Sequence, residues 1–149
     1  MAKMVKVGMA DLNICHSPDA ITTLGLGSCV GVALYDKNTK TAGLVHVMLP
    51  DSTKVRQNQN RAKFADTGID YLIELLEKEG AKKSSLTAKI AGGAQMFAFS
   101  SSNDMLRVGE RNVEAVKDKL KKLGIRILAE DTGLNYGRTV EFYPETGDF

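Results

Sequence analysis

A cysteine that follows a glycine-rich segment is the side chain of this sequence best suited to chemistry. The segment reads Gly25-Leu26-Gly27-Ser28-Cys29, and His46 lies one predicted hairpin further along the chain. A free thiol has a pKa of about 8.5, so it becomes a nucleophile near neutral pH only beside a base or a cation. An imidazole is well suited to supply that base. Since the sequence holds only two cysteines and two histidines, few pairings are open.

The register of the predicted hairpin decides whether the thiol and the imidazole can meet. Side chains alternate between the two faces of a strand, so a shift of one residue moves a side chain to the other face. If Tyr35 pairs with Lys40 across the turn, Cys29 lies directly opposite His46. This register favours contact.

Two other registers are compatible with the same turn. If Asp36 pairs with Thr41, His46 lies opposite Gly31 and diagonal to Cys29 on the same face. Diagonal neighbours are roughly 7–8 Å apart, which an imidazole can span. If instead Tyr35 pairs with Thr41 across a five-residue turn, Cys29 and His46 lie on opposite faces. Two of the three registers therefore allow contact.

The glycines before the cysteine favour a site at which a substrate approaches the main chain. Gly25 and Gly27 permit backbone angles with positive φ. Exposed N–H groups around Ser28 and Cys29 could then stabilise an oxyanion. A phosphate-binding loop is disfavoured, because Val30 stands where a third glycine is needed and no Lys-Ser/Thr pair follows.

A structural explanation of the same residues stays open. A cysteine that opens an apolar strand is often a small buried hydrophobe, and a strand histidine is often a hydrogen-bonded core residue. Cys15 and His16 form a poorer pair, because adjacent residues of an extended segment point to opposite faces. A metal site made of these two residues with Cys29 and His46 has no ligand pair at the usual spacing, so no metal is expected.

Composition predicts an ordinary globular protein and argues against several classes. With 149 residues, 43% hydrophobic and 26% charged, we expect residues 1–149 to form a single domain. No apolar run approaches the roughly 20 residues of a membrane span and no signal peptide is evident, so we expect a cytoplasmic protein with reduced thiols. The net charge is only +2, and the basic cluster at 117–122 has helical spacing without interleaved aromatics, which argues against nucleic-acid binding.

The apolar patterns predict strands mixed with two amphipathic helices, which is typical of an α+β fold. Strands are expected at 4–9, 29–35, 44–49, 87–91, 125–129 and 139–143, and helices around 69–76 and 113–123, ending at Gly80 and Gly124. Turns or loops are expected at 15–19, 36–40, 51–61 and 100–104. The polar segment 51–61 is either a gate beside the hairpin or a plain surface loop.

Five segments give the sequence a resemblance to the CheD family, the chemoreceptor glutamine deamidases of prokaryotic chemotaxis. They are Gly25–Val30, Gly43–Pro50, Lys89–Phe97, Gly109–Asn112 and Gly137-Arg138. Each segment is weak alone, but their order and spacing together are specific.

This resemblance implies a mechanism and a fold. Cys29 is the implied nucleophile, His46 the base, and Thr23 the residue that orients the imidazole, with the adjacent Thr22 as the alternative. Cys29 would form a γ-glutamyl thioester that water hydrolyses to glutamate, with no metal or organic cofactor. The family is similar to the deamidating domain of cytotoxic necrotizing toxins, which implies a β-sandwich-like core of mixed or antiparallel strands flanked by helices.

The resemblance also implies two partners: the cytoplasmic helices of chemoreceptors as substrate, and a CheC-type phosphatase. Met96, Phe97 and Phe99 form either a docking patch for the phosphatase or a strand end packed in the core. Two other functions stay open. One is another thiol acyl-transfer enzyme, a cysteine protease or transglutaminase; the other is a non-enzymatic adaptor that acts by binding the phosphatase.

Overall fold

The computed structural model describes residues 2–50, 52, 60–94, 108–133 and 137–149, and within them the chain has an α+β fold with two mixed sheets. The strands are β1 (Met4–Val7), β2 (Leu12–His16), β3 (Ala20–Leu26), β4 (Val30–Asp36), β5 (Thr41–Val47), β6 (Thr87–Gly92), β7 (Arg126–Thr132) and β8 (Arg138–Phe142). The helices are α1 (Ala65–Lys78) and α2 (Val108–Leu123), with short 3₁₀ helices at Arg61–Lys63 and Lys83–Ser85. No helix among these residues is long and apolar enough to span a membrane.

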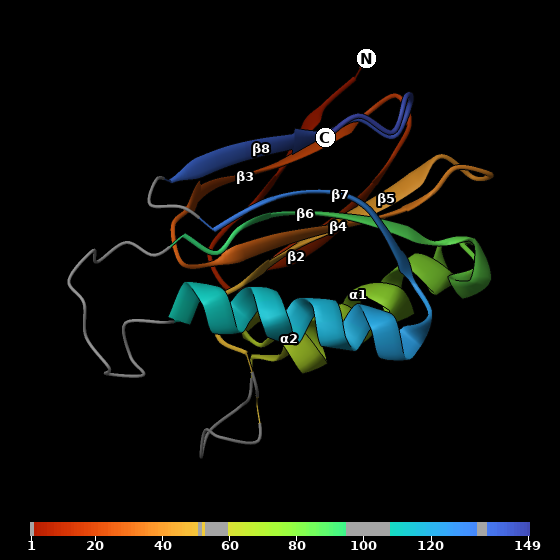
Figure 1. The fold of residues 1–149 in the computed structure, drawn as a ribbon. Coiled ribbons are helices and arrows are strands. Elements are labelled where there is room, and N and C mark those ends of the chain that lie inside the picture. Colours follow the sequence, from red (N-terminus) through yellow and green to blue (C-terminus); the bar gives the residue numbers. More distant parts are fainter. Residues whose placement is uncertain (1, 51, 53–59, 95–107, 134–136) are drawn as a thin grey trace.

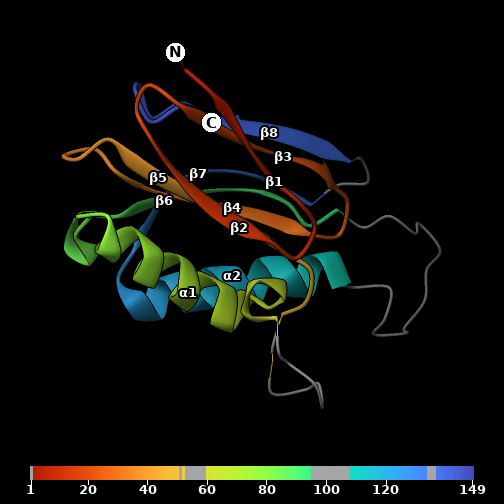
Figure 2. The same cartoon turned by 180° about the vertical axis from the view of Figure 1, so that it is seen from behind.

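Three layers stack on one another (Figure 1). A three-stranded sheet, in the order β1-β3-β8, lies over one face of a five-stranded sheet, in the order β2-β5-β4-β6-β7. Helices α1 and α2 both cover the opposite face of the larger sheet, as the view from behind also shows (Figure 2). The predicted α+β class is confirmed, and both described helices lie on one side of the sheets.

The central strands β4 and β5 are buried on both faces, which explains their near-continuous apolar sequences. One set of side chains packs against the helices; it includes Val30, Val32, Leu34, Val45, Val47, Leu72 and Leu120. The alternate set packs between the two sheets and includes Ile21, Ala33, Ala42, Leu44 and Phe142. His46 lies on the same face of β5 as Ala42 and Leu44, so its side chain lies between the two sheets.

The hairpin formed by β4 and β5 has the second of the three registers considered above. Asp36 pairs with Thr41, and Gly31 pairs with His46. Because Cys29 comes two residues before Gly31, it lies diagonal to His46 on the same face. The observed register is therefore one of the two that allow contact between Cys29 and His46.

Two sequence predictions near this hairpin were wrong. The turn expected at 15–19 begins later, because β2 continues through His16 and pairs with β5. The segment Ala20–Leu26, for which no strand was predicted, is β3, the central strand of the smaller sheet. Its glycines suggested a turn, but Gly25 (φ 70°) lies in a register irregularity between Thr23 and Leu26, which a strand can contain.

The other predicted elements are present with shifted ends. Helices α1 and α2 each begin several residues before their predicted starts, and β6, β7 and β8 correspond to the strands expected at 87–91, 125–129 and 139–143, with shifted ends. The loop predicted at 100–104 and most of the segment 51–61 lie outside the described residues.

Candidate active site

The candidate nucleophile lies where the chain crosses from one sheet to the other. Strand β3 of the smaller sheet ends at Leu26, and β4 of the larger sheet begins at Val30. Cys29 is therefore the last residue of the connection between the two sheets, next to the interface where they pack together. Its side chain is 8% exposed and packs with Leu26 and Ala91.

His46 is fully buried, and a threonine of the opposite sheet holds its ring. Thr23 Oγ1 lies 2.8 Å from His46 Nδ1 and donates to the carbonyl of Val7 at 2.8 Å. A hydroxyl has one hydrogen, and a carbonyl can only accept, so Thr23 must accept a hydrogen bond from Nδ1–H. The neutral ring therefore carries its proton on Nδ1 and has a lone pair on Nε2. The other threonine considered, Thr22, donates instead to the carbonyl of Val140 at 2.7 Å.

A missing side chain on the neighbouring strand makes this contact across the sheets possible. Gly31 is paired with His46, and a Cβ atom at Gly31 would lie 3.2 Å from Leu26 Cδ1 and 3.6 Å from Thr23 Cγ2. Glycine at this position leaves the space that the side chains of β3 occupy. Thr23 can therefore approach the face of β4 and β5 on which His46 lies.

The described part of the chain contains no hydrogen-bond partner for His46 Nε2, although this atom is buried. An unpaired buried nitrogen is unfavourable, so its presence calls for an explanation. Burial lowers the pKa of His46, because it disfavours the charged imidazolium. Burial also raises the pKa of the Cys29 thiol, an effect partly offset by the Cys29 backbone N–H. At neutral pH the site thus contains a neutral thiol and a neutral base, rather than an ion pair.

The main chain before Cys29 is held by its carbonyl groups. The carbonyl of Gly27 accepts from Ala94 N, and that of Cys29 accepts from Gly93 N, both at 2.8 Å. The carbonyl of Ser28 accepts from the side chain of Asn112 at 2.9 Å. All three carbonyls are therefore fixed.

The N–H groups of the same segment differ in their use. That of Gly27 donates to the carbonyl of Gly25 at 3.0 Å, so it closes the turn. Those of Ser28 and Cys29 donate to none of the described residues. Of the two residues predicted for an oxyanion site, Gly27 and Ser28, only Ser28 has an N–H group with no acceptor in the described part of the chain, and Cys29 has a second such group.

Gly92 allows the neighbouring chain to pack against the nucleophile. It has φ of 108°, and a Cβ atom there would lie 2.2 Å from the carbonyl oxygen of Cys29. Sequence reasoning did not assign Gly92, Gly93 or Asn112 to the site. The paired glycines directly after a predicted strand were the available signal, because such a pair often marks a close backbone approach.

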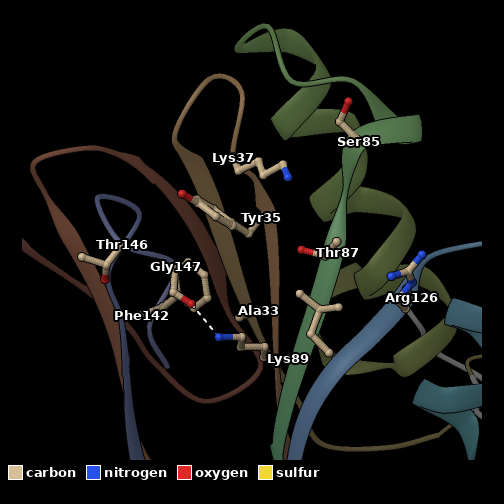
Figure 3. A pocket seen from close by; sticks show the side chains of 11 residues that line it. Ala33, Tyr35, Lys37, Ser85, Thr87, Lys89, Arg126, Phe142, Thr146 and Gly147 are labelled. Atoms are coloured by element: carbon tan, nitrogen blue, oxygen red, sulfur yellow. Dashed lines mark hydrogen bonds between the residues drawn. The ribbon is translucent and has the colours of Figure 1, made fainter.

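A separate pocket of about 320 Å³ lies at the other end of β4 (Figure 3). Its lining includes Tyr35, Lys37, Lys89 and Arg126, and Lys89 Nζ donates to the carbonyl of Gly147 at 2.7 Å. The lining contains no cysteine, histidine or carboxylate, so it offers no thiol and base in combination. The residues Met96, Phe97 and Phe99, predicted as a docking patch, lie outside the described residues.

A thiol and a neutral imidazole on one face, beside two free amides, are the groups that a thiol-dependent acyl-transfer enzyme needs. Comparison with known proteins gives the particular family. A family model described as CheD chemotactic sensory transduction matches residues 48–149. The chain belongs to the CheD family of chemoreceptor glutamine deamidases.

Individual relatives support this assignment over nearly the whole chain. The chain is 70% identical to the CheD protein of Lachnoclostridium phytofermentans, over 99% of this chain and 92% of that protein. It is 61% identical to the chemoreceptor glutamine deamidase CheD of Halalkalibacterium halodurans (98% and 91% covered) and 53% identical to that of Bacillus subtilis (97% and 88% covered). The crystal structure of the Bacillus licheniformis hypothetical protein YfiH is similar with a TM-score of 0.47 and 16% identity, over 78% of this chain and 47% of that one.

Proposed function

We propose that this protein hydrolyses glutamine side chains of chemoreceptors to glutamate, with Cys29 as nucleophile, His46 as general base and Thr23 as the residue that orients His46. The observation that supports these roles is the buried Nε2 of His46, which has no hydrogen-bond partner among the described residues and lies on the face that His46 shares with Cys29. A ring whose Nδ1–H is held by Thr23 has its lone pair on the nitrogen that must accept the thiol proton.

The first half of the reaction forms a thioester. His46 Nε2 takes the proton of the Cys29 thiol while the sulfur attacks the carboxamide carbon of the glutamine. The oxyanion that develops accepts hydrogen bonds from the amides of Ser28 and Cys29. The protonated His46 then gives its proton to the leaving nitrogen, and ammonia departs.

The second half restores the enzyme. His46 Nε2 takes a proton from a water molecule that attacks the thioester carbon, and the same amides hold the oxyanion again. The Cys29 sulfur leaves and recovers its proton, and the glutamine side chain has become glutamate. No hydrogen bond joins the Cys29 thiol to Nε2 among the described residues, so we expect this contact to tighten when a substrate is bound.

The remaining features of the proposal come from the family resemblance. The substrate glutamines would lie on the cytoplasmic helices of chemoreceptors, so the protein would act in the cytoplasm. A CheC-type phosphatase would bind it through Met96, Phe97 and Phe99. Residues 1–149 would form one domain with a fold similar to the deamidating domain of cytotoxic necrotizing toxins. A pull-down with a CheC-type protein, with and without alanine at Phe97, tests the partner.

The activity is tested by mass spectrometry of a chemoreceptor cytoplasmic fragment incubated with the protein. We expect a Gln-to-Glu mass shift at specific residues with the unaltered protein and with Cys15→Ala, and none with Cys29→Ala. Ammonia should appear in step with the shift, without cleavage or cross-linking of the fragment.

The other outcomes point to other functions. Cleavage or cross-linking would indicate a protease or a transglutaminase. A bound, helical fragment that no variant modifies would indicate an adaptor. Equal activity of Cys29→Ala and the unaltered protein would contradict the assignment of the nucleophile.

A further inference from the structure

Asn112 lies outside the set of groups that the proposed reaction uses, yet it is fully buried beside them. It belongs to the first part of α2, and its Nδ2 donates to the carbonyl of Ser28 and to the carbonyl of Met48, both at 2.9 Å. The orientation of this amide follows from its partners, since both are carbonyl oxygens and only the NH₂ group can donate to them. One side chain thus connects the segment that carries Cys29 to the end of the strand that carries His46.

The two hydrogen bonds of Asn112 lie at the point where β4 and β5 cease to pair. Their ladder ends at the pair Val30 and Val47, so Met48 would be next in line opposite Cys29. The N–H groups of Met48 and Leu49 turn away instead and donate to the carbonyl of Lys63 at 2.8 and 3.0 Å. The Asn112 amide occupies the place between the two separated ends and fixes how far apart they lie.

The bond to Ser28 also determines where the next amide points. In a trans peptide the C=O and the N–H point in opposite directions. A carbonyl of Ser28 held by Asn112 therefore directs the Cys29 N–H away from α2. Hydrogen bonding to a carbonyl also polarises its peptide unit, which makes the N–H of the same unit a stronger donor.

An asparagine at this position carries a cost to stability. Its Oδ1 is buried and has no hydrogen-bond partner among the described residues. An unpaired buried acceptor is unfavourable, and an apolar side chain would avoid it. The NH₂ end of the side chain donates to the carbonyls of Ser28 and Met48, which an apolar residue cannot do.

We propose that Asn112 is a positioning residue for the deamidase reaction, which orients and strengthens the Cys29 N–H as an oxyanion donor and sets the separation of the strand ends that carry Cys29 and His46. This inference rests on the proposed function of Cys29. Asn112 does not touch the substrate; it acts through the Ser28–Cys29 peptide unit. Its loss should lower kcat more than it changes KM, because an oxyanion contact forms mainly in the transition state.

The test uses Asn112→Leu, which has a similar shape but no donor, and Asn112→Asp, which has the same shape and places an acceptor at the donor position. Val116→Ala is the matched control, because Val116 is a fully buried residue of the same helix that packs in the core away from Cys29. All variants are made in the Cys15→Ala chain, so that only Cys29 can be alkylated. Measurements are made at a temperature at which circular dichroism shows each variant to be folded.

Two readouts separate positioning from stability. We expect kcat for the receptor fragment to fall on the order of tenfold in the Asn112 variants, less than the ~10²–10³-fold that follows removal of an oxyanion donor itself. We also expect the midpoint of Cys29 alkylation by iodoacetamide to move to higher pH, because a weaker N–H stabilises the thiolate less. Val116→Ala should lower the melting temperature without either change.

The inference is overturned if the folded Asn112 variants match Val116→Ala in both kcat and alkylation midpoint. It is also overturned if neither variant folds, because Asn112 would then act on folding. The alkylation midpoint needs no substrate. An unaltered protein that is inactive on the receptor fragment would therefore contradict the proposed function, while the midpoint would still test the role of Asn112.

Discussion

The molecule contains two sets of one cysteine, one histidine and one threonine, and they differ in how the histidine is held. The inner set is Cys29, His46 and Thr23; the edge set is Cys15, His16 and Thr41, on β2 and its neighbour β5. In both sets the histidine Nδ1 is at hydrogen-bond distance from the threonine Oγ1, 2.8 Å in the inner set and 3.0 Å in the edge set. Residue types and this one distance therefore do not distinguish them.

The surroundings of the other ring nitrogen, Nε2, distinguish the two sets. His16 Nε2 lies 3.0 Å from a carboxylate oxygen of Glu79, which can only accept, so this nitrogen carries a proton and has no lone pair to offer. The His16 side chain is 46% exposed, while Cys15 points into the layer between the sheets. Burial, together with the charge of Asp19, raises the pKa of Cys15 to about 12. The edge set thus lacks both an available base and a thiol on the same face.

The largest effect that tests this comparison is expected from removal of the histidines. His46→Ala should lower kcat for receptor deamidation by ~10²–10⁴-fold, because it removes the group that transfers the proton in both halves of the proposed reaction. His16→Ala should leave kcat unchanged, since this change removes only the contacts of His16 with Glu79 and Thr41, and neither of these residues has a role in the proposed reaction. Steady-state kinetics on the receptor fragment measures both, and equal losses in the two variants would contradict the distinction between the sets.

A smaller effect is expected from the threonines. Thr23→Val keeps the shape of the side chain but leaves Nδ1 without its acceptor, so the imidazole is no longer fixed in the tautomer with a free Nε2. We expect kcat to fall about tenfold, which corresponds to the loss of one hydrogen bond. Thr41→Val is the matched change in the edge set and should leave kcat unaltered. An unaltered kcat in Thr23→Val would show that the tautomer is set by another group.

The pH dependence of kcat/KM should show which of the two histidines acts in the reaction, and this test uses an enzyme that is fully active at neutral pH. Because burial lowers the pKa of His46, the acidic limb of kcat/KM should lie below the ordinary histidine value of about 6.5, and His16→Ala should not move it. As the pH falls through the folded pKa, Nε2 becomes protonated and activity is lost. An acidic limb above about 6.5 would contradict a buried neutral base.

The same titration predicts the direction of a stability change. As the pH decreases below about 6.5, the unfolded chain binds a proton at His46 before the folded chain does. The free energy of unfolding therefore decreases as the pH decreases, until the pH reaches the pKa of His46 in the folded chain. His46→Ala should remove this part of the slope in urea denaturation, and His16→Ala should keep it.

Much of the inner set was predictable from the sequence, because it depends on one hairpin. The pairing of two apolar strands around a short polar turn allowed a small number of registers, and the observed one places Gly31 opposite His46. Thr23 could be related to His46 only through the family resemblance. Strand β3 belongs to the other sheet, and contacts between stacked sheets leave no periodic pattern in one sequence.

Asn112 shows the other limit of sequence reasoning. It lies 84 positions from Ser28 and 64 from Met48, and its two hydrogen bonds depend on where α2 packs. Helical periodicity predicted the helix and its apolar face, but nothing in that pattern distinguishes a buried asparagine at the start of the helix from an ordinary first-turn polar residue.

The protonated state of Cys29 at rest also bears on how the protein tolerates oxidants. Peroxides attack thiolates rather than thiols, so oxidation to sulfenic acid follows thiolate character and exposure. Cys29 is 8% exposed and burial raises its pKa, and both properties slow this reaction in the absence of substrate. In the proposed reaction, the cysteine becomes reactive only when its proton passes to His46, at the moment when the substrate carbonyl lies beside the sulfur. We therefore expect a nucleophile of this kind to resist oxidation and to be a poor redox sensor.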